Sequence, residues 1–165
     1  MRYRLDIYCQ NNNLFDMYSD RALTHMGKTH RDSGFDLVVP EQVPIFSGDR
    51  GVKIDHQVQC TMSFLDNNKV IRTYCGFYLY MRSSTGTKTP LRLSNIVGII
   101  DPGYRGNIIA AFDNMDISMY MVESHHRLVQ ICPPNITYDM DVEVHHGPVP
   151  VDSERGMDGF GSTGY

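Results

Sequence analysis

Alternation of apolar and polar residues is the main pattern along this chain. It is clearest from Val52 to Met62, where, apart from His56, apolar side chains occupy the even positions and polar ones the odd positions. A period of two residues is typical of a strand with one buried and one solvated face. His56 falls on the apolar side, which predicts a hydrogen-bonded histidine in the core.

Further short strands are predicted along the rest of the chain, separated by turn residues. They are expected at residues 3–9, 35–39, 43–46, 70–81, 96–100, 107–112, 117–122, 127–132 and 138–145. The stretch 10–32 is mostly polar with no clear period, and 85–90 is expected to form a loop or a single helical turn. No segment has a helical period over three turns. Many short strands with regular turns predict an all-β sandwich or closed barrel.

The segment from Ile96 to Phe112 is predicted to be a β-hairpin. Its turn is Asp101-Pro102-Gly103-Tyr104, in which proline presets φ and glycine accepts the positive φ of a type II turn. Such a hairpin would hold the carboxylate of Asp101 at a rigid bend beside the phenol of Tyr104. Taken alone, an aspartate that opens a turn is most often structural.

Composition limits the classes of function. A chain of 165 residues is expected to form one domain, and a net charge of −4 with no basic run argues against direct nucleic-acid binding. No apolar run approaches the roughly 18 residues of a membrane span, and the first residues lack the apolar core of a signal peptide. The four cysteines have no CxxC spacing, which predicts reduced core thiols and a cytoplasmic or nuclear location.

The composition changes at residue 146. From there the chain is rich in Gly, Pro, Asp and Ser and has almost nothing to bury, which is typical of a flexible tail. We therefore expect a folded domain over residues 1–145 and a C-terminal arm over residues 146–165.

Five short motifs occur in order between Ser33 and Gly164. They are Ser33-Gly34-Phe35-Asp36-Leu37; Arg82-Ser83-Ser84; Asn95 with Gly98-Ile99-Ile100-Asp101-Pro102-Gly103-Tyr104-Arg105-Gly106; Arg127-Leu128-Val129-Gln130; and Arg155-Gly156 with Gly159-Phe160-Gly161-Ser162-Thr163-Gly164. In these residues and their order the chain closely resembles the homotrimeric dUTPase family, all-β enzymes that hydrolyse dUTP to dUMP and pyrophosphate. The third and fifth motifs are the specific ones.

The resemblance implies a fold, an assembly and a role. The fold would be a jelly-roll-like barrel, assembled as a homotrimer in which the C-terminal arm folds over substrate bound in a neighbouring subunit. The activity would limit uracil in DNA and supply dUMP for dTMP synthesis. Viral and cellular members look alike at motif level, so a viral origin is compatible with the sequence.

The resemblance also implies roles at the reacting phosphate. Asp101 would be the general base that holds water against the α-phosphate. Magnesium would bridge the triphosphate oxygens, and Asp36 would order that hydrated ion through water. The groups that would contact phosphate are Arg82, Ser83, Ser84, Gln130, Arg155, Ser162, Thr163 and the backbone amides of the glycines near Phe160, Gly161 among them.

Residues of the third motif and of the arm would recognise the base. Asn95 and main-chain groups near Gly98 and Ile100 would present the hydrogen-bonding complement of uracil. By resemblance Tyr104 would stack beneath the deoxyribose, and Phe160 would stack on the base.

Two alternatives remain at this point, and one motif departs from the family pattern. A dCTP deaminase shares the Ile-Asp-Pro-Gly segment but needs a glutamate on the next strand, where this chain has Ala111, with Asp113 two positions on. A dUTPase-like protein could also have become a non-catalytic regulatory binding module. In the fourth motif, His125 stands where the family usually has glycine, so the local bend is expected to differ.

Overall fold

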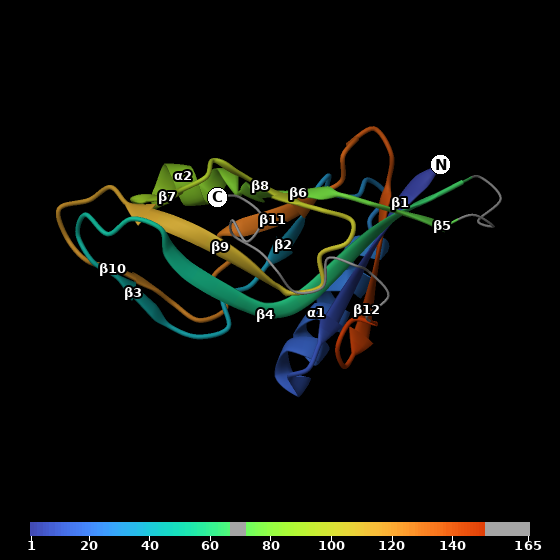
Figure 1. The fold of residues 1–165 in the computed structure, drawn as a ribbon, viewed down its shortest axis with the longest axis horizontal. Coiled ribbons are helices and arrows are strands. Elements are labelled where there is room, and N and C mark those ends of the chain that lie inside the picture. The colour runs from blue at the N-terminus through green and yellow to red at the C-terminus, as the bar shows by residue number, and fades with distance from the viewer. Residues whose placement is uncertain (67–71, 151–165) are drawn as a thin grey trace.

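The computed structural model describes residues 1–66 and 72–150. This part of the chain forms twelve strands and two helices (Figure 1). The elements are β1 (Arg2–Cys9), α1 (Asn12–Met26), β2 (Phe35–Leu37), β3 (Val43–Ile45), β4 (Val52–Leu65), β5 (Arg72–Cys75), β6 (Phe77–Met81), α2 (Ser83–Lys88), β7 (Leu91–Leu93), β8 (Val97–Ile100), β9 (Asn107–Asn114), β10 (Tyr120–Val122), β11 (Val129–Cys132) and β12 (Met140–His146). Strands dominate, so the all-β prediction is confirmed.

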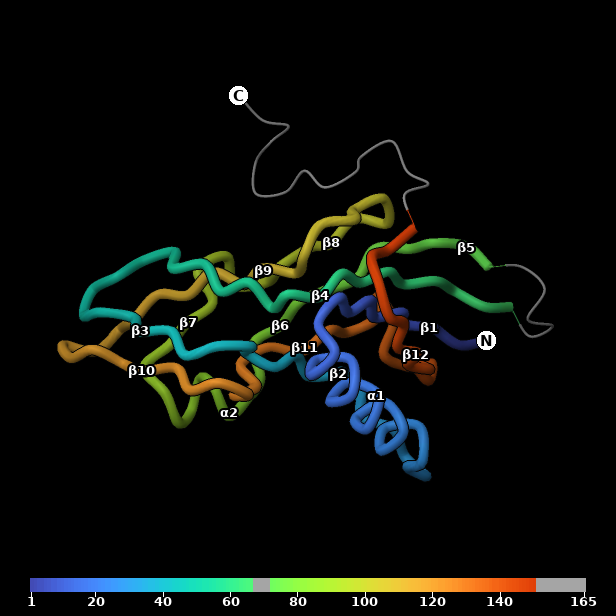
Figure 2. The backbone as a smooth tube through the Cα atoms, turned by 90° about the horizontal axis from the view of Figure 1, so that it is seen from below, coloured from blue at the N-terminus to red at the C-terminus, as the bar shows by residue number. Residues whose placement is uncertain are grey.

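Two larger sheets and one two-stranded ribbon make up the architecture. The first sheet has the order β12-β1-β4-β9-β7, with β5 paired to β4, and the second has the order β2-β11-β6-β8. β3 and β10 form the ribbon, which lies at the opposite end of the molecule from β5 (Figure 1; Figure 2). β1 and β12 are parallel, whereas β4 is antiparallel to β1, β5 and β9.

One hydrophobic core joins the two larger sheets. Ile54 and Ile108 of the first sheet and Leu79 and Ile131 of the second are at most 2% exposed. Burial of each such side chain contributes roughly 1.5–3 kcal/mol to the free energy of folding. His56 lies in this core, as the sequence predicts, with Nδ1 2.8 Å from the carbonyl oxygen of Val38.

Residues 12–26 form helix α1, so the interpretation that no segment has a helical period over three turns is wrong for this stretch. Asn11 caps the helix, because its side-chain oxygen accepts hydrogen bonds from the N–H groups of Asn13 and Leu14. The buried face is a narrow stripe, which the surrounding polar residues obscure in the sequence; it consists of Leu14, Tyr18, Ala22 and His25.

The single strand predicted at residues 70–81 is two strands, β5 and β6, in the described part of that range. β5 pairs with β4 in the first sheet, whereas β6 pairs with β8 and β11 in the second. The chain crosses between the sheets at Gly76. A Cβ atom on Gly76 would lie 2.9 Å from the carbonyl oxygen of Ile100, so only glycine allows this close approach.

The hairpin predicted around Asp101 is instead a crossing between sheets. β8 pairs with β6 in the second sheet, whereas β9 pairs with β4 and β7 in the first. The turn is present, since the N–H of Tyr104 donates to the carbonyl oxygen of Asp101 at 3.1 Å. Among the described glycines, positive φ occurs at Gly48, Gly51 and Gly147. The turn at Gly103 is therefore not type II.

The chain stays packed against the folded domain beyond the end of β12. The N–H of Gly147 donates to the carbonyl oxygen of Cys9 at 2.9 Å, and the N–H of Val149 donates to Oε1 of Gln59 at 2.8 Å. Val149 is buried. Residues 151–165 of the arm predicted at 146–165 lie outside the described residues, so the division at residue 146 stays a prediction.

The four cysteines are free thiols, as their spacing predicts. Three of them, Cys9, Cys60 and Cys132, are buried, and burial raises the pKa of each of these thiols. Neither described helix is long and apolar enough to cross a membrane.

Candidate functional site

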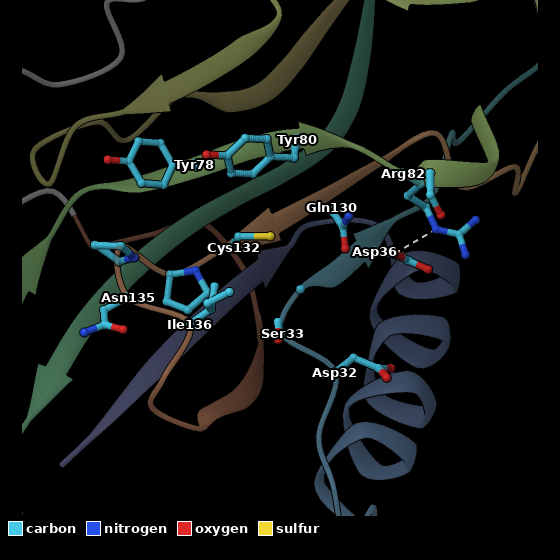
Figure 3. Close-up of a pocket in the computed structure, with 14 residues that line it drawn as sticks. Asp32, Ser33, Asp36, Tyr78, Tyr80, Arg82, Gln130, Cys132, Asn135 and Ile136 are labelled. Atoms are coloured by element: carbon cyan, nitrogen blue, oxygen red, sulfur yellow. Dashed lines mark ion pairs between the residues drawn. The ribbon is translucent and has the colours of Figure 1, made fainter. Parts of the chain in front are cut away.

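Three arginines surround the carboxylate of Asp36, the central residue of β2. The Nε of Arg82, which precedes α2, lies 2.9 Å from Oδ1 (Figure 3). The Nη1 of Arg127, just before β11, lies 3.2 Å from Oδ2, and the Nη2 of Arg21 on α1 lies 3.8 Å from Oδ2. Three guanidinium groups against one carboxylate leave an excess of positive charge. We call these four residues the arginine cluster; its charge and its planar donors suit a phosphate ligand.

Gln130 lies beside the arginine cluster in the second sheet. It is opposite Asp36 on one side and opposite Tyr80 on the other. Directly opposed residues of antiparallel strands share a face, so the three side chains point to the same side of the sheet. Gly34 leaves room for Gln130, because a Cβ atom at position 34 would lie 2.3 Å from its Oε1. Gln130 can therefore present its amide to a ligand at the cluster.

A cavity of about 770 Å³ opens on this face of the sheet (Figure 3). Its polar end carries Asp36, Arg82, Ser83 and Gln130. The opposite wall is largely aromatic and aliphatic and consists of Tyr78, Tyr80, Pro133, Pro134 and Ile136. One chain thus provides a cavity with a polar end, beside the arginine cluster, and an aromatic wall.

Arg82 is fixed by contacts of α2 with the start of β11. The N–H of Arg82 donates to the carbonyl oxygen of Leu128 at 2.9 Å, and the buried hydroxyl of Thr85 donates to the same oxygen at 2.8 Å. The Nη1 of Arg82 also lies 3.3 Å from the hydroxyl oxygen of Ser84. The second and fourth motifs are therefore joined directly, and both meet the first motif at Asp36.

His125 has a φ of 65°, in the left-handed region that favours glycine. Its N–H donates to the carbonyl oxygen of Val39 at 2.7 Å, and the N–H of Val39 donates to the carbonyl oxygen of His126 at 2.8 Å. This is the position at which the family pattern has glycine. His125 thus adopts the left-handed conformation that glycine takes at little cost, and whether the bend differs from that of the family stays a prediction.

Asp101 lies at the opposite end of β6 from Arg82. The Cα of Asp101 is 3.9 Å from the Cβ position of Gly76, which precedes β6, whereas Arg82 follows the last residue of β6. At about 3.3 Å per residue, the chain from Gly76 to Arg82 spans about 20 Å. That span exceeds the reach of the two side chains toward one phosphate. Within one chain, Asp101 and the arginine cluster do not form a common site.

The turn that carries Asp101 is braced by its neighbours. Arg105 is buried, and its Nη1 donates to the carbonyl oxygens of Pro102 at 2.7 Å and Tyr104 at 3.0 Å. The hydroxyl of Tyr104 donates to the carbonyl oxygen of Asn107 at 2.8 Å. Burial raises the pKa of the Tyr104 phenol, and the carboxylate of Asp55 adds to this effect. The phenol therefore stays a hydrogen-bond donor.

The residues predicted to recognise the base lie along one strand. Asn95 is exposed and precedes β8, whereas Gly98 and Ile100 are part of β8. Gly98 packs against β6, since a Cβ atom there would lie 3.0 Å from the Cβ of Leu79. The predicted residues of the arm lie outside the described residues; they are Arg155, Phe160, Gly161, Ser162 and Thr163.

The arginine cluster fits a hydrated magnesium ion only together with a polyphosphate. Among the described residues, Oδ1 of Asp36 accepts from Arg82, and Oδ2 faces Arg127 and Arg21. A carboxylate oxygen has two lone pairs, so Oδ1 can accept one more hydrogen bond, from a metal-bound water. The surrounding positive charge disfavours a bare cation. Asp36 thus suits an ion that arrives with phosphate groups.

One described group of three metal-ligating side chains lies elsewhere, between β1 and β12, and consists of Asp6, Glu143 and His145. The fully buried carboxylate of Asp6 accepts from the Nε of Arg4 at 2.9 Å and the Nη2 of Arg72 at 2.5 Å, and lies 2.7 Å from the Nε2 of His145. Two guanidinium groups repel a cation, so this is an internal ion network. Removal of one partner of such a network costs about 3–5 kcal/mol.

Two residues of the arginine cluster were missed by the sequence interpretation. Arg127 stands in the fourth motif, but the sequence interpretation gave the role in that motif to Gln130. Arg21 lies outside all five motifs and reaches Asp36 only because α1 packs beside β2. Recognition of the helical stripe that begins at Leu14 would have placed Arg21 on a helix, although not beside Asp36.

Known proteins with similar sequences are deoxyuridine 5'-triphosphate nucleotidohydrolases. A deoxyuridine 5'-triphosphate nucleotidohydrolase of Leifsonia xyli is 34% identical over 135 residues, which are 81% of this chain and 80% of that protein. The corresponding protein of Clostridioides difficile is 37% identical over 84 residues, but these are 51% of this chain and 57% of that protein. No protein-family profile matches the chain.

Solved structures with a similar fold are also dUTPases. A dUTPase from Streptococcus mutans superimposes with a TM-score of 0.51 and 29% identity, covering 64% of this chain and 79% of that one. A variant of the Staphylococcus bacteriophage 80alpha dUTPase, solved with dUpNHpp, has a TM-score of 0.55 and 21% identity over 98% of both chains. The predicted jelly-roll-like fold is therefore confirmed. Because the Leifsonia relative matches over most of both chains, this chain belongs to the dUTPase family.

Proposed function

We propose that the protein hydrolyses dUTP to dUMP and pyrophosphate. The observation that carries this proposal is the arginine cluster, in which residues of the first, second and fourth motifs of the family meet at one carboxylate. An excess of guanidinium charge there neutralises phosphate charge, which phosphoryl transfer requires. Ser83, Ser84 and Gln130 would add neutral donors to the phosphate oxygens.

Asp101 would act as the general base. Its carboxylate would accept a proton from a water as that water attacks the α-phosphorus, and pyrophosphate would leave on the opposite side. The braced turn supports this role, because Arg105 and Tyr104 hold the main chain of the turn that carries the carboxylate. Magnesium bound with the triphosphate would neutralise charge on its oxygens, and Asp36 would hold a water of that ion.

Asn95 and the main chain of β8 near Gly98 and Ile100 would select uracil. A cytosine would leave buried polar groups there without partners, and a thymine would need space for its methyl group. Tyr104 would stack beneath the deoxyribose and Phe160 on the base. Arg155, Ser162, Thr163 and the amide of Gly161 would close over the phosphates from the arm.

We propose that the active protein is a homotrimer whose sites are shared between subunits. The separation of Asp101 from Arg82 along β6 supports this, because one chain cannot bring both to one phosphate. A second copy would place its Asp101 turn over the cavity beside the arginine cluster. The arm, from residue 146 on, would be exchanged between subunits to close the site.

The deaminase alternative is not favoured by the position of Asp113. Its Oδ1 accepts hydrogen bonds from the hydroxyl of Ser94 at 2.7 Å and from the N–H of Gly51 at 2.8 Å. The bond from Ser94, followed by that from Gly51, lowers the pKa of the Asp113 carboxyl. A carboxylate held ionised in this way is a poor proton shuttle.

One assay distinguishes these functions. Purified protein with magnesium is offered dUTP, dCTP, dTTP and UTP, and pyrophosphate, ammonia and the nucleoside monophosphate are measured. We expect pyrophosphate and dUMP from dUTP alone. Ammonia from dCTP would indicate the deaminase, and tight dUTP binding without turnover would indicate the regulatory module. Orthophosphate in place of pyrophosphate would refute attack at the α-phosphorus.

A further inference from the structure

Helix α1 covers the open edge of β2. β2 is the terminal strand of the second sheet and pairs there with β11. On its other edge, the N–H of Val38 donates to the hydroxyl of Tyr18 at 2.9 Å, and the carbonyl oxygen of Asp36 accepts from the Nη2 of Arg21 at 3.2 Å. Side chains of a helix thus take the place of a neighbouring strand.

The position of α1 is fixed by packing against Phe35. The ring of Phe35 lies 6.3 Å from that of Tyr18 and 5.7 Å from that of His25, measured between centroids. The guanidinium carbon of Arg21 lies 5.6 Å from the centroid of the same ring. Because His25 also contacts the carbonyl oxygen of Met140 at 3.0 Å, the helix has little freedom to move along β2.

Arg21 is an unusual cation for a purely structural contact. Its side chain is 25% exposed, and its Nε is buried without a hydrogen-bond partner among the described residues. Burial lowers the pKa of Arg21, and the nearby charge of Arg127 lowers it further. A half-buried and incompletely paired guanidinium beside two like charges opposes folding, which points to a use in ligand binding.

We propose that Arg21 is a positioning residue of the phosphate site. It holds both the backbone and the carboxylate of Asp36, so that Asp36 can align Arg82 and Arg127 toward the phosphates of a nucleoside triphosphate. This inference rests on the proposed function for the identity of the ligand. It adds α1, which carries none of the five motifs, to the substrate site.

The test compares Arg21→Gln with a matched arginine variant, Arg31→Gln. Arg31 is a similarly shielded arginine near the same helix, but it pairs with Asp141 rather than with the cluster. For Arg21→Gln we expect the KM for dUTP and the Kd for dUpNHpp to rise about tenfold, as loss of one charged hydrogen bond implies. Arg31→Gln should leave both constants unchanged. Arg21→Lys should fall between Arg21→Gln and the wild type, and it carries the test if Arg21→Gln does not fold.

A double-mutant cycle with Asp36→Asn separates positioning from general stabilisation. If Arg21 acts through Asp36, adding Arg21→Gln to Asp36→Asn should change KM and Kd by less than twofold. Full additivity in the cycle, or a fall in melting temperature with unchanged KM and Kd, would overturn the proposal. If the wild-type protein binds dUpNHpp but does not hydrolyse dUTP, only the proposed activity is refuted. The double-mutant cycle can then still be measured from the Kd for dUpNHpp. Absence of any dUpNHpp binding would overturn both.

Discussion

The Nε of Arg82 lies 2.9 Å from Oδ1 of Asp36, and this ion pair joins the end of β6 to the middle of β2. A lysine at position 82 would keep the charge but lose the planar fork that reaches Asp36 and a phosphate together. We expect Arg82→Lys to lower kcat/KM for dUTP about 10- to 100-fold, as loss of a hydrogen bond to a charged group implies. Arg92→Lys is the control, because Arg92 is exposed and its hydrogen bonds within the described part of the chain go to the carbonyl oxygens of Thr89 and Leu91.

Gly34 is predicted to affect the binding of dUTP through the side chain of Gln130. A methyl group at position 34 would displace the flexible end of the Gln130 side chain and lie 3.0 Å from the Sγ of Cys132, so Gly34→Ala should fold with a small loss of melting temperature. Its KM for dUTP should rise as much as that of Gln130→Ala, and the double variant should be no worse than either. A large additional loss in the double variant would show that Gly34 acts by another route. Steady-state kinetics of the three variants provide the measurement.

His125 offers a test of backbone strain. Because its φ is 65°, glycine at this position avoids a cost that any residue with a Cβ atom bears. His125→Gly should therefore be more stable than His125→Ala by about 1 kcal/mol. Chemical denaturation of the two variants measures this difference. Equal stability, or a more stable alanine variant, would contradict the left-handed conformation at position 125.

His56 predicts a pH dependence of stability. Burial lowers the pKa of His56, and the hydrogen bond to the backbone of Val38 opposes this shift only in part. Below the ordinary histidine pKa of about 6.5, the unfolded chain binds a proton that the folded protein does not. The free energy of unfolding should then fall with falling pH, by up to about 1.4 kcal/mol per pH unit, until the folded pKa is reached. Above pH 6.5 this contribution is constant.

Denaturant unfolding between pH 5.5 and 7.5 measures that slope. His56→Gln should reduce the slope, whereas His30→Gln, at an exposed position, should leave it as in the wild type. An unchanged slope in His56→Gln would show that other groups cause the loss of stability in acid.

Sequence patterns located the strands well where one face is buried. β1, β4 and β11 were predicted from alternation and from their turn residues, and each lies within a few residues of its predicted bounds. Which strands pair with one another could not be predicted from these patterns. Nothing local distinguishes a hairpin at Asp101 from a crossing between sheets, because β8 and β9 find their partners far away in the sequence. The break at Gly76 likewise depends on the approach of Ile100.

The candidate site was predicted in its motifs but not in its geometry. Asp36, Arg82 and Gln130 lie together, whereas the roles that the resemblance implies for them stay predictions. Arg21 could not be predicted, because its contact with Asp36 requires both an unrecognised helix and the packing of that helix on the edge of β2. The distance between Asp101 and the cluster also follows from strand pairing, which the order of motifs along the chain does not contain.

The most direct test of the account mixes two inactive variants. Arg82→Ala lacks a phosphate ligand and Asp101→Asn lacks the general base, for which a rate loss of at least about a hundredfold is expected. The two proteins are unfolded together in equal amounts, refolded, confirmed as trimers by light scattering, and assayed for pyrophosphate release from dUTP. If each site takes Arg82 from one subunit and Asp101 from another, random assembly restores about a quarter of the wild-type activity. A mixture no more active than its components would place both residues in one subunit's site and contradict the account.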